Sequence, residues 1–328
     1  MVMSVLAKGW NRFEDKGILV ILIVICLILT IVAPNFAQTS NILNILKQIS
    51  EICVTGVGLT LVIICAEIDL SVGSLYGLCM MVAALILQTT QSSITAVILA
   101  IGTGMGVGLV NGLLVTKIRV PAFIATLSML YILRGCIYVV TDGTPISQFP
   151  NTDIWFFNLG VSIGGVFPVQ IIVMAVFVIG IGLLLKKGTL GFKFFAVGGN
   201  QKAAHLAGIN VDKVKIAAFV ITGFCCAWAA IIALAYMKSV HPTIGGGREM
   251  DVIAAVIIGG TNLYGGRGSA TGTLIGAAIM GVMRNGMVML GVQAFYQTAF
   301  IGVVILVAVV ADIWLKRSGQ ALRRLKTS

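Results

Sequence analysis

The chain has 328 residues, of which 59% are hydrophobic and only 10% are charged, and its mean hydropathy is +1.07. No single soluble core could bury so many apolar side chains, so the composition excludes a soluble domain and indicates a protein that crosses a membrane several times. The formal net charge of +11 is typical either of orientation signals in membrane loops or of a nucleic-acid partner.

Ten apolar segments follow one another along the chain, and a membrane-spanning helix needs about 20 mostly apolar residues. The segments cover residues 18–33, 52–66, 70–87, 94–115, 120–140, 166–185, 214–237, 251–260, 270–291 and 298–315. The second and the eighth are short, as half-helices or re-entrant segments are, and such backbone is tolerated only where protein or water surrounds it. We therefore predict an all-α polytopic membrane protein with eight to ten transmembrane helices, ten being preferred.

The basic residues are distributed unevenly between the two sides of this predicted bundle. With the N-terminus in the cytoplasm and ten alternating helices, 17 of the 22 Lys and Arg residues fall in cytoplasmic segments. Cytoplasmic loops carry such an excess in membrane proteins generally. We therefore expect both termini in the cytoplasm, and outer segments that hold Lys47, Lys238 and Arg248. We interpret the positive charge as a signal that orients the protein in the lipid membrane. Nucleic acid is not a predicted partner.

A pattern recurs in the two halves of the chain. I-G-x8-N-G occurs at residues 101–112 and again at 275–286, so that Asn111 and Asn285 hold equivalent positions, and an E-x-D pattern precedes each copy at 67–69 and 249–251. The offsets predict two related halves, about 52–140 and 214–315. Because equivalent helices are five apart, an odd number, the halves should have opposite topology, as in many transporters. Chance matching of apolar segments is the alternative.

The E-x-D patterns place carboxylates beside predicted helix starts. Asp69 falls at the cytoplasmic junction of the second and third helices, and Asp251 at the outer junction of the seventh and eighth. Two roles are open for each aspartate. It caps the following helix, Asp69 by accepting from a backbone N–H near Ser71, or it contacts the substrate or a gating partner. Glu67 is expected to face solvent or a basic group such as Lys117.

Arg134 lies inside the fifth apolar segment, roughly 20 Å along a helix from Pro121. A charge at that depth must find a partner or reach the interface. We expect it to face protein in the outer half of the pathway, where structural pairing is preferred over direct substrate contact.

Four longer stretches carry a family resemblance. They read EIDLSVGS (67–74), VPAFIATLSMLYILRG (120–135), AVGGNQKAAHLAGINVDKVKI (196–216) and EMDVIAAVIIGGTNLYGGRGSATGTLIGAAIMGV (249–282). In this order, over almost the whole chain, they resemble the membrane permease subunits of bacterial ABC sugar importers, the ribose/xylose/arabinose/galactoside permease family. Two charges depart from that pattern: Glu67 replaces a small residue, and Arg284 replaces a polar amide.

The resemblance implies a single multi-pass permease domain over residues 1–328 in the bacterial cytoplasmic (inner) membrane. Such a permease imports a monosaccharide from a periplasmic or extracellular solute-binding protein by alternating access, and it is not an enzyme because a separate ABC ATPase subunit hydrolyses ATP. The chain agrees in lacking a G-x-x-x-x-G-K-[ST] phosphate loop. Two copies of the chain, a homodimer, are expected around a shared pathway.

The resemblance also implies that the predicted cytoplasmic loop, about 187–213, carries a short coupling helix that docks on the ATPase. The residues carried over are Gly199, Asn200, Ala203, Ala204, Leu206, Gly208 and Ile209. Ala203, Ala204 and Leu206 are expected to offer a small apolar patch.

Two other function classes are weighed against the importer. An ion-coupled secondary transporter of a small polar solute would need an ionisable relay at the membrane midplane, and the deepest predicted charges, Arg134 and Arg284, do not release protons. An intramembrane enzyme would need a nucleophile and base or a metal-binding set. The sequence shows neither a nucleophile with a base nor a metal-binding set, so no metal site or cofactor is expected.

The predicted outer loop 141–165 holds Trp155, Phe156 and Phe157. These aromatic residues are interpreted as an interfacial belt or as part of a docking surface for the solute-binding protein, and both interpretations can hold together.

Overall fold

The computed structural model describes residues 2–149, 155–163, 167–293, 295–304, 306–307 and 310, with side chains from residue 17 onward. The helices are α1 (Val2–Val32), α2 (Thr39–Ile64), α3 (Val72–Thr90), α4 (Ser93–Thr116), α5 (Ala122–Thr141), α6 (Trp155–Asn158), α7 (Val169–Lys187), α8 (Thr189–Gly199), α9 (Gln201–Leu206), α10 (Val211–Met237), α11 (Arg248–Ile258) and α12 (Ala270–Met289). A further helix covers Phe295–Val304. The two short strands β1 (Ser162–Ile163) and β2 (Phe167–Pro168) pair antiparallel.

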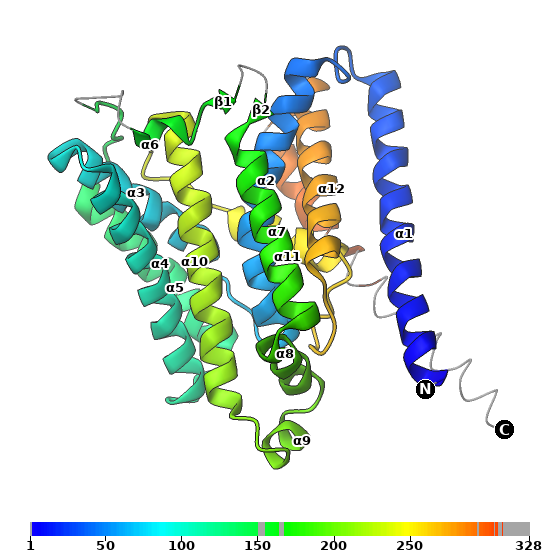
Figure 1. Cartoon of the computed structure of the whole chain (residues 1–328). Coiled ribbons are helices and arrows are strands. Elements are labelled where there is room, and N and C mark those ends of the chain that lie inside the picture. Colours follow the sequence, from blue (N-terminus) through cyan, green and yellow to red (C-terminus); the bar gives the residue numbers. More distant parts are fainter. Residues whose placement is uncertain are drawn as a thin grey trace.

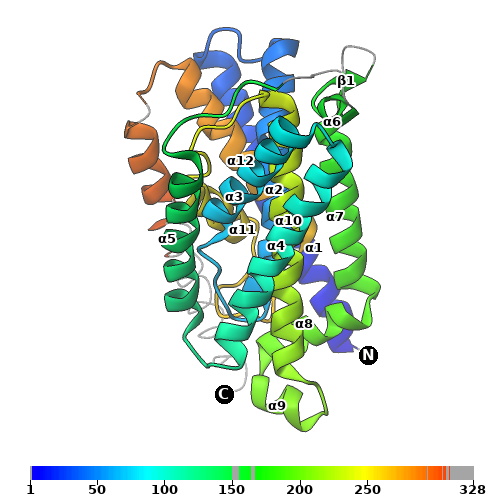
Figure 2. The same cartoon turned by 90° about the vertical axis from the view of Figure 1, so that its left-hand side faces the viewer.

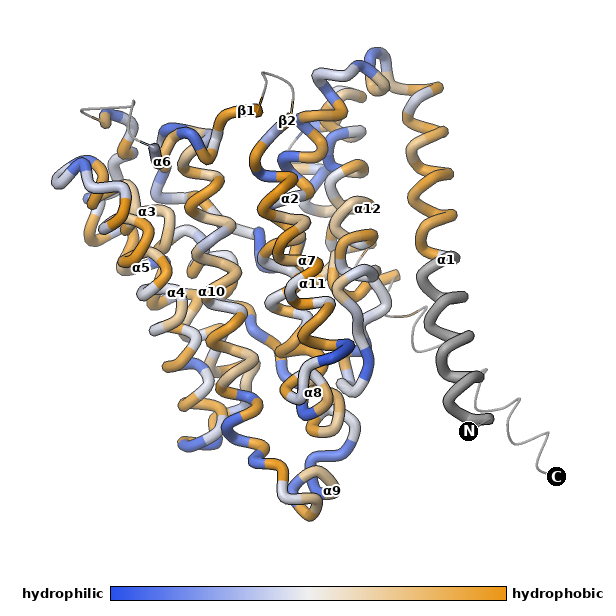
Figure 3. The backbone as a smooth tube through the Cα atoms, viewed as in Figure 1, coloured by the Kyte–Doolittle hydropathy of each residue, from blue (hydrophilic) through white to orange (hydrophobic). Residues whose placement is uncertain are grey.

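Within these described residues, seven helices are long and apolar enough to cross a membrane, namely α2, α3, α4, α5, α7, α10 and α12. The apolar stretches Gly17–Val32 and Phe295–Val304 are shorter. Figure 3 shows hydrophobic residues along all of the long helices. The predicted class, an all-α polytopic membrane protein, is confirmed. The count of ten stays a prediction, because part of the tenth segment and the basic residues 316–326 lie outside the described residues.

The start of the second segment was predicted wrongly. α2 begins at Thr39 rather than at residue 52 and runs for 26 residues, so it is a full helix and not a half-helix. Polar residues in its first turns lower the local hydropathy, which is why an apolar pattern misses them. The eighth segment is short, as predicted, because α11 has 11 residues.

Glycines allow α4 and α10 to pack backbone to backbone. A Cβ atom built on Gly223 of α10 would lie 2.0 Å from the carbonyl oxygen of Gly104 in α4, and one built on Gly108 would lie 2.4 Å from the carbonyl oxygen of Phe219. Small residues permit such close approach between membrane helices. α10 also packs against α2 and α3, so α2 and α10 form the centre of the bundle (Figure 1).

One end of the bundle carries α8 and α9, and we call it the α9 end (Figure 1). α4 finishes at this end, where Lys117 donates to Asp212 at the start of α10 over 3.0 Å. α12 begins at this end, because Gly266 in the loop before it donates its amide to the carbonyl of Ile64 (2.9 Å) and that loop touches Gly198 of α8. α4 and α12 therefore run in opposite directions.

The helices α3 and α11 both start inside the bundle (Figure 2). Residues 65–71 lead inward from the α9 end, and residues 238–247 lead inward from the opposite end. The two helix starts meet at glycines: a Cβ on Gly73 would lie 2.6 Å from the carbonyl oxygen of Gly245, which itself has φ +76°. A side chain at either position would separate the two starts.

Candidate functional site

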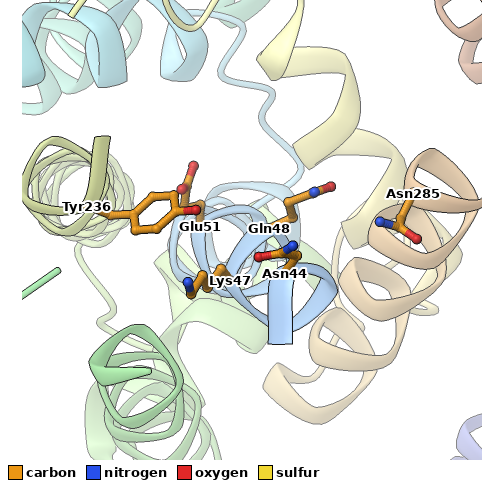
Figure 4. A pocket seen from close by; sticks show the side chains of 6 residues that line it. All are labelled: Asn44, Lys47, Gln48, Glu51, Tyr236 and Asn285. Carbon is orange, nitrogen blue, oxygen red and sulfur yellow. The ribbon is translucent and has the colours of Figure 1, made fainter. Parts of the chain in front are cut away.

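A cavity of about 300 Å³ lies between α2, α10 and α12 (Figure 4). Its lining residues all have polar groups: Asn44, Lys47, Gln48, Glu51, Tyr236 and Asn285. Four of them share one face of α2, because positions i, i+3, i+4 and i+7 of a helix point to the same side. Amides and charges inside a membrane bundle usually face a watery path rather than lipid, so this cavity is the candidate solute site.

Glu51 makes the best-defined contacts at the cavity. Its Oε2 atom accepts from Nη2 of Arg248 at 2.7 Å and from the hydroxyl of Tyr76 at 3.1 Å. The guanidinium carbon of Arg248 lies 4.1 Å from the centre of the Tyr76 ring. The side chains of Glu51 and Arg248 are only 16% and 18% exposed, so removing either partner would leave a poorly solvated charge.

Lys47 stacks its ammonium group on an aromatic ring. Its Nζ atom lies 4.4 Å from the ring centre of Tyr236, a cation–π contact. Among the residues that the structure describes, no carboxylate lies within 4.0 Å of this atom. Lys47 and Arg248 were both predicted in outer segments. The structure instead places Lys47 within α2 and Arg248 at the start of α11.

The first turn of α11 is tied to three other helices. Arg248 pairs with Glu51 of α2, and Asp251 pairs with Arg284 of α12. Arg134 of α5 donates through Nη1 to the carbonyl oxygens of residues 242 and 244, at 3.0 and 2.7 Å, in the segment that leads into α11. Asp251 is therefore not a cap, because the N-cap of α11 is residue 247 and the carboxylate instead meets a guanidinium.

Replacing Arg134 by leucine is expected to lower the yield of folded protein by several-fold. The substitution leaves the carbonyl oxygens of Pro242 and Ile244 without the charged donor that holds them, and losing a charged hydrogen bond costs about 1.5–3 kcal/mol. Size-exclusion chromatography of the detergent-solubilised protein measures that yield. A variant with normal yield but impaired uptake would favour direct substrate contact, and a variant normal in both would remove both roles.

Asp69 is buried between α3 and α4, with 1% of its surface exposed. Its Oδ1 atom accepts from the backbone N–H of Ser71 at 2.9 Å and from the Ser71 hydroxyl at 2.6 Å. Nδ2 of Asn111 donates to the same hydroxyl at 2.9 Å. The structure thus brings together Asp69, Ser71 and Asn111. The N-cap of α3 is Ser71 itself, so Asp69 orders the turn before the helix rather than occupying the cap position.

Replacing Asp69 by asparagine is expected to leave folding and uptake nearly unchanged. Asparagine keeps an oxygen that accepts from both donors of Ser71, and it removes a buried charge for which no cation lies within 4.0 Å in the described part of the chain. Alanine loses the oxygen that accepts both hydrogen bonds and should cost about 1 kcal/mol or more of stability. Thermal unfolding and uptake of the two variants are the measurements. An inactive but well-folded asparagine variant would show that the charge handles the substrate.

Glu67 pairs with a different lysine from the one suggested by the sequence. Its Oε1 atom lies 2.6 Å from Nζ of Lys215, whereas Lys117 pairs with Asp212. Both charges that depart from the family pattern therefore have a countercharge, Glu67 in Lys215 and Arg284 in Asp251.

Asn285 contacts a different partner from its sequence counterpart. Its side-chain amide exchanges two hydrogen bonds with Asn41, of 3.0 and 2.9 Å, and does not pair with a serine as Asn111 does.

The predicted coupling segment forms α8, α9 and the turn after them. Asn200 caps α9, because its Oδ1 accepts from the backbone N–H of Ala203 at 3.0 Å. The predicted apolar patch is partly wrong: Ala204 is only 4% exposed because it packs into the turn, where its carbonyl accepts from Ile209 at 3.0 Å. Leu206 is 87% exposed.

Two glycines complete the predicted coupling residues. Gly208 has φ +81°, the left-handed conformation that favours glycine, and a Cβ atom built on Gly199 would meet nothing within 4 Å.

Sequence reasoning missed most of the cavity. Asn44, Gln48, Glu51, Tyr76 and Tyr236 had no assigned role. A usable signal was present, since the polar residues at 44, 47, 48 and 51 have helical spacing directly before an apolar run.

Comparisons with known proteins identify the family to which the chain belongs. Residues 41–309 match the family described as branched-chain amino acid transport system / permease component. The ribose import permease protein RbsC of Escherichia coli K12 is 42% identical over 308 residues, which cover 93% of this chain and 95% of that protein. RbsC of Bacillus subtilis is 39% identical over 292 residues (89% and 90%), and the L-arabinose ABC transporter permease protein AraH of Azospirillum brasilense is 32% identical over 323 residues (97% and 93%). No solved structure matches. The chain therefore belongs to this family of transport-system permease components, alongside the ribose and arabinose permeases of bacterial ABC transporters.

Proposed function

We propose that this chain is the permease subunit of an ATP-driven ABC importer that moves a monosaccharide across the bacterial inner membrane. The observation that carries the proposal is the polar cavity between α2, α10 and α12. Its amide side chains both donate and accept hydrogen bonds, as the hydroxyl groups of a sugar do. Relatives named for ribose and L-arabinose support the same substrate class.

Alternating access between two inverted halves is the proposed mechanism. The opposite directions of α4 and α12 support it, and so do the starts of α3 and α11 inside the bundle. Transporters commonly bind solutes beside such interrupted helices. Unwound backbone inside a membrane is tolerated only against protein or a watery cavity, and a solute path provides such a cavity. In this mechanism, closure of the ATPase moves α8 and α9, and the Glu67–Lys215 pair connects the segment before α3 to α10 at the same end.

The partners follow from the mechanism. A solute-binding protein delivers the sugar at the end opposite α9, and an ABC ATPase docks at the α9 end, which is cytoplasmic. We expect both termini on that cytoplasmic side as well. Two copies of the chain are expected in the transporter, since one copy offers one coupling segment and the ATPase unit of this family has two docking grooves.

Uptake by whole cells tests this proposal. Cells that lack their own monosaccharide transport are given this chain together with an ATPase and a binding protein from the same genome, and uptake of radiolabelled D-ribose, L-arabinose, D-xylose and D-galactose is followed. We expect at least one sugar to accumulate, and accumulation to disappear when the phosphate-loop lysine of the ATPase is replaced. Uptake that continues with the disabled ATPase would contradict the proposal.

A further inference from the structure

Lys47 and Glu51 each contact other residues, although their spacing on α2 favours an ion pair between them. They lie one turn apart on α2, and opposite charges at i and i+4 of a helix commonly interact. In the described residues, however, no ion pair joins them, because Glu51 pairs with Arg248 while Lys47 stacks on Tyr236. Figure 4 shows Lys47, Glu51 and Tyr236 on the α10 side of the cavity, and Gln48 and Asn285 on the α12 side.

Both charged groups keep hydrogen-bonding capacity toward the cavity. The contacts of Glu51 with Arg248 and Tyr76 both use Oε2, and no described residue donates to its Oε1 atom. The stacked ammonium group of Lys47 retains its three N–H donors, and no described side chain or backbone group accepts from them. Arg248 and Tyr76 thus hold the carboxylate of Glu51 in place, and Tyr236 holds the ammonium group of Lys47, without using all of the hydrogen-bonding capacity of the two groups.

These two residues differ in kind from the rest of the lining. The amides of Asn44, Gln48 and Asn285 both donate and accept, so they tolerate a hydroxyl group in either role. Lys47 only donates and Glu51 only accepts. A solute that leaves the charged group of Lys47 or Glu51 without a hydrogen bond in this partly buried site binds less tightly. Sites that form a hydrogen bond with a substrate hydroxyl discriminate strongly against analogues that lack this hydroxyl.

We infer that Lys47 and Glu51 are the residues that determine which sugar this permease accepts. Glu51 requires a sugar hydroxyl that donates a hydrogen bond to its carboxylate. Lys47 requires a sugar oxygen that accepts a hydrogen bond from its ammonium group, roughly one helical turn away from that hydroxyl. The inference rests on the proposed function, because it assigns specificity to the cavity of a monosaccharide permease.

The test compares the uptake rates of a panel of sugars in proteoliposomes that contain the purified complex. The panel is D-ribose, 2-deoxy-D-ribose, L-arabinose, D-xylose and D-galactose. The variants are Glu51→Gln, which still accepts from Arg248 and Tyr76, and Lys47→Met. Matched controls are Asp142→Asn, an exposed carboxylate at the same end of the bundle, and Lys238→Met, a lysine whose Nζ lies 5.7 Å from the ring centre of Phe157.

We expect both cavity variants to fold and to change the ratio of uptake rates between panel members by about tenfold or more. The controls should keep the ranking of the unmodified protein. Equal loss of uptake for every sugar, an unchanged ranking, or misfolding of both cavity variants would each overturn the inference. Failure of the unmodified complex to carry any panel sugar would instead overturn the proposed function.

Discussion

Replacing Gly223 by leucine is expected to prevent the chain from reaching its folded state. A Cβ atom at this position would lie 2.0 Å from the carbonyl oxygen of Gly104, so the backbones of α4 and α10 would have to separate. Overpacking a rigid contact costs about 1–3 kcal/mol and occasionally more. The obstacle here is backbone, which cannot rotate away as a side chain can, so we expect the upper end of that range or beyond.

Size-exclusion profiles of the solubilised protein measure this effect. The matched control is Gly102→Leu in the partner helix α4, where a Cβ atom would meet nothing within 4 Å. The control should give a profile like that of the unmodified chain, and Gly223→Leu should give mainly aggregate. Two identical monodisperse profiles would show that α4 and α10 do not pack as described.

Replacing Leu206 by glutamate is expected to reduce sugar uptake to background while folded yield stays normal. Leu206 is 87% exposed on α9, so the charge meets solvent in the isolated permease and should not disturb its fold. An apolar side chain this exposed suits a groove on the proposed ATPase, and a buried glutamate without a partner would oppose docking. Uptake and co-purification of the ATPase are the two measurements.

Ile118→Glu is the matched control for this experiment. Ile118 is 65% exposed and follows α4 at the same end of the bundle. We expect the control to retain ATPase attachment. Normal uptake by the Leu206→Glu variant would remove α9 from the coupling surface.

Local patterns in the sequence were sufficient to locate most helices. Hydropathy predicts nearly every segment, because each long helix is apolar along most of its length. It fails at the start of α2 because the cavity-facing residues Asn44, Lys47, Gln48 and Glu51 are polar, so the candidate site itself weakened the signal. The hydrogen bond of Asp69 to the next turn is also a local interaction, and the expected backbone donor near Ser71 is found at Ser71 itself, at 2.9 Å.

Contacts between distant parts of the chain were not predictable from local patterns. Glu67 and Lys215 are 148 residues apart, and Glu51 and Arg248 are 197 apart. Which lysine or arginine meets which carboxylate depends on how the helices pack, and several candidates of each sign were present. The starts of α3 and α11 inside the bundle likewise depend on the contact between Gly73 and Gly245.

In the coupling segment, too, sequence patterns did not predict which side chains are buried, although the residues concerned are close together in the chain. The stretch taken from the resemblance forms α8, α9 and the following turn at one end of the bundle, yet the resemblance could not distinguish Ala204, which is buried in the turn, from Leu206, which is exposed. That difference arises from the tight fold of residues 200–209 around a left-handed Gly208.

The energy source for transport is the most direct test of the account. Proteoliposomes are prepared with the permease, the ATPase and the binding protein, and sugar accumulation is measured with ATP, with a non-hydrolysable ATP analogue, and with a proton or sodium gradient in place of ATP. We predict accumulation only with hydrolysable ATP and only when all three proteins are present. Accumulation by the permease alone on an ion gradient would contradict the account and identify a secondary transporter.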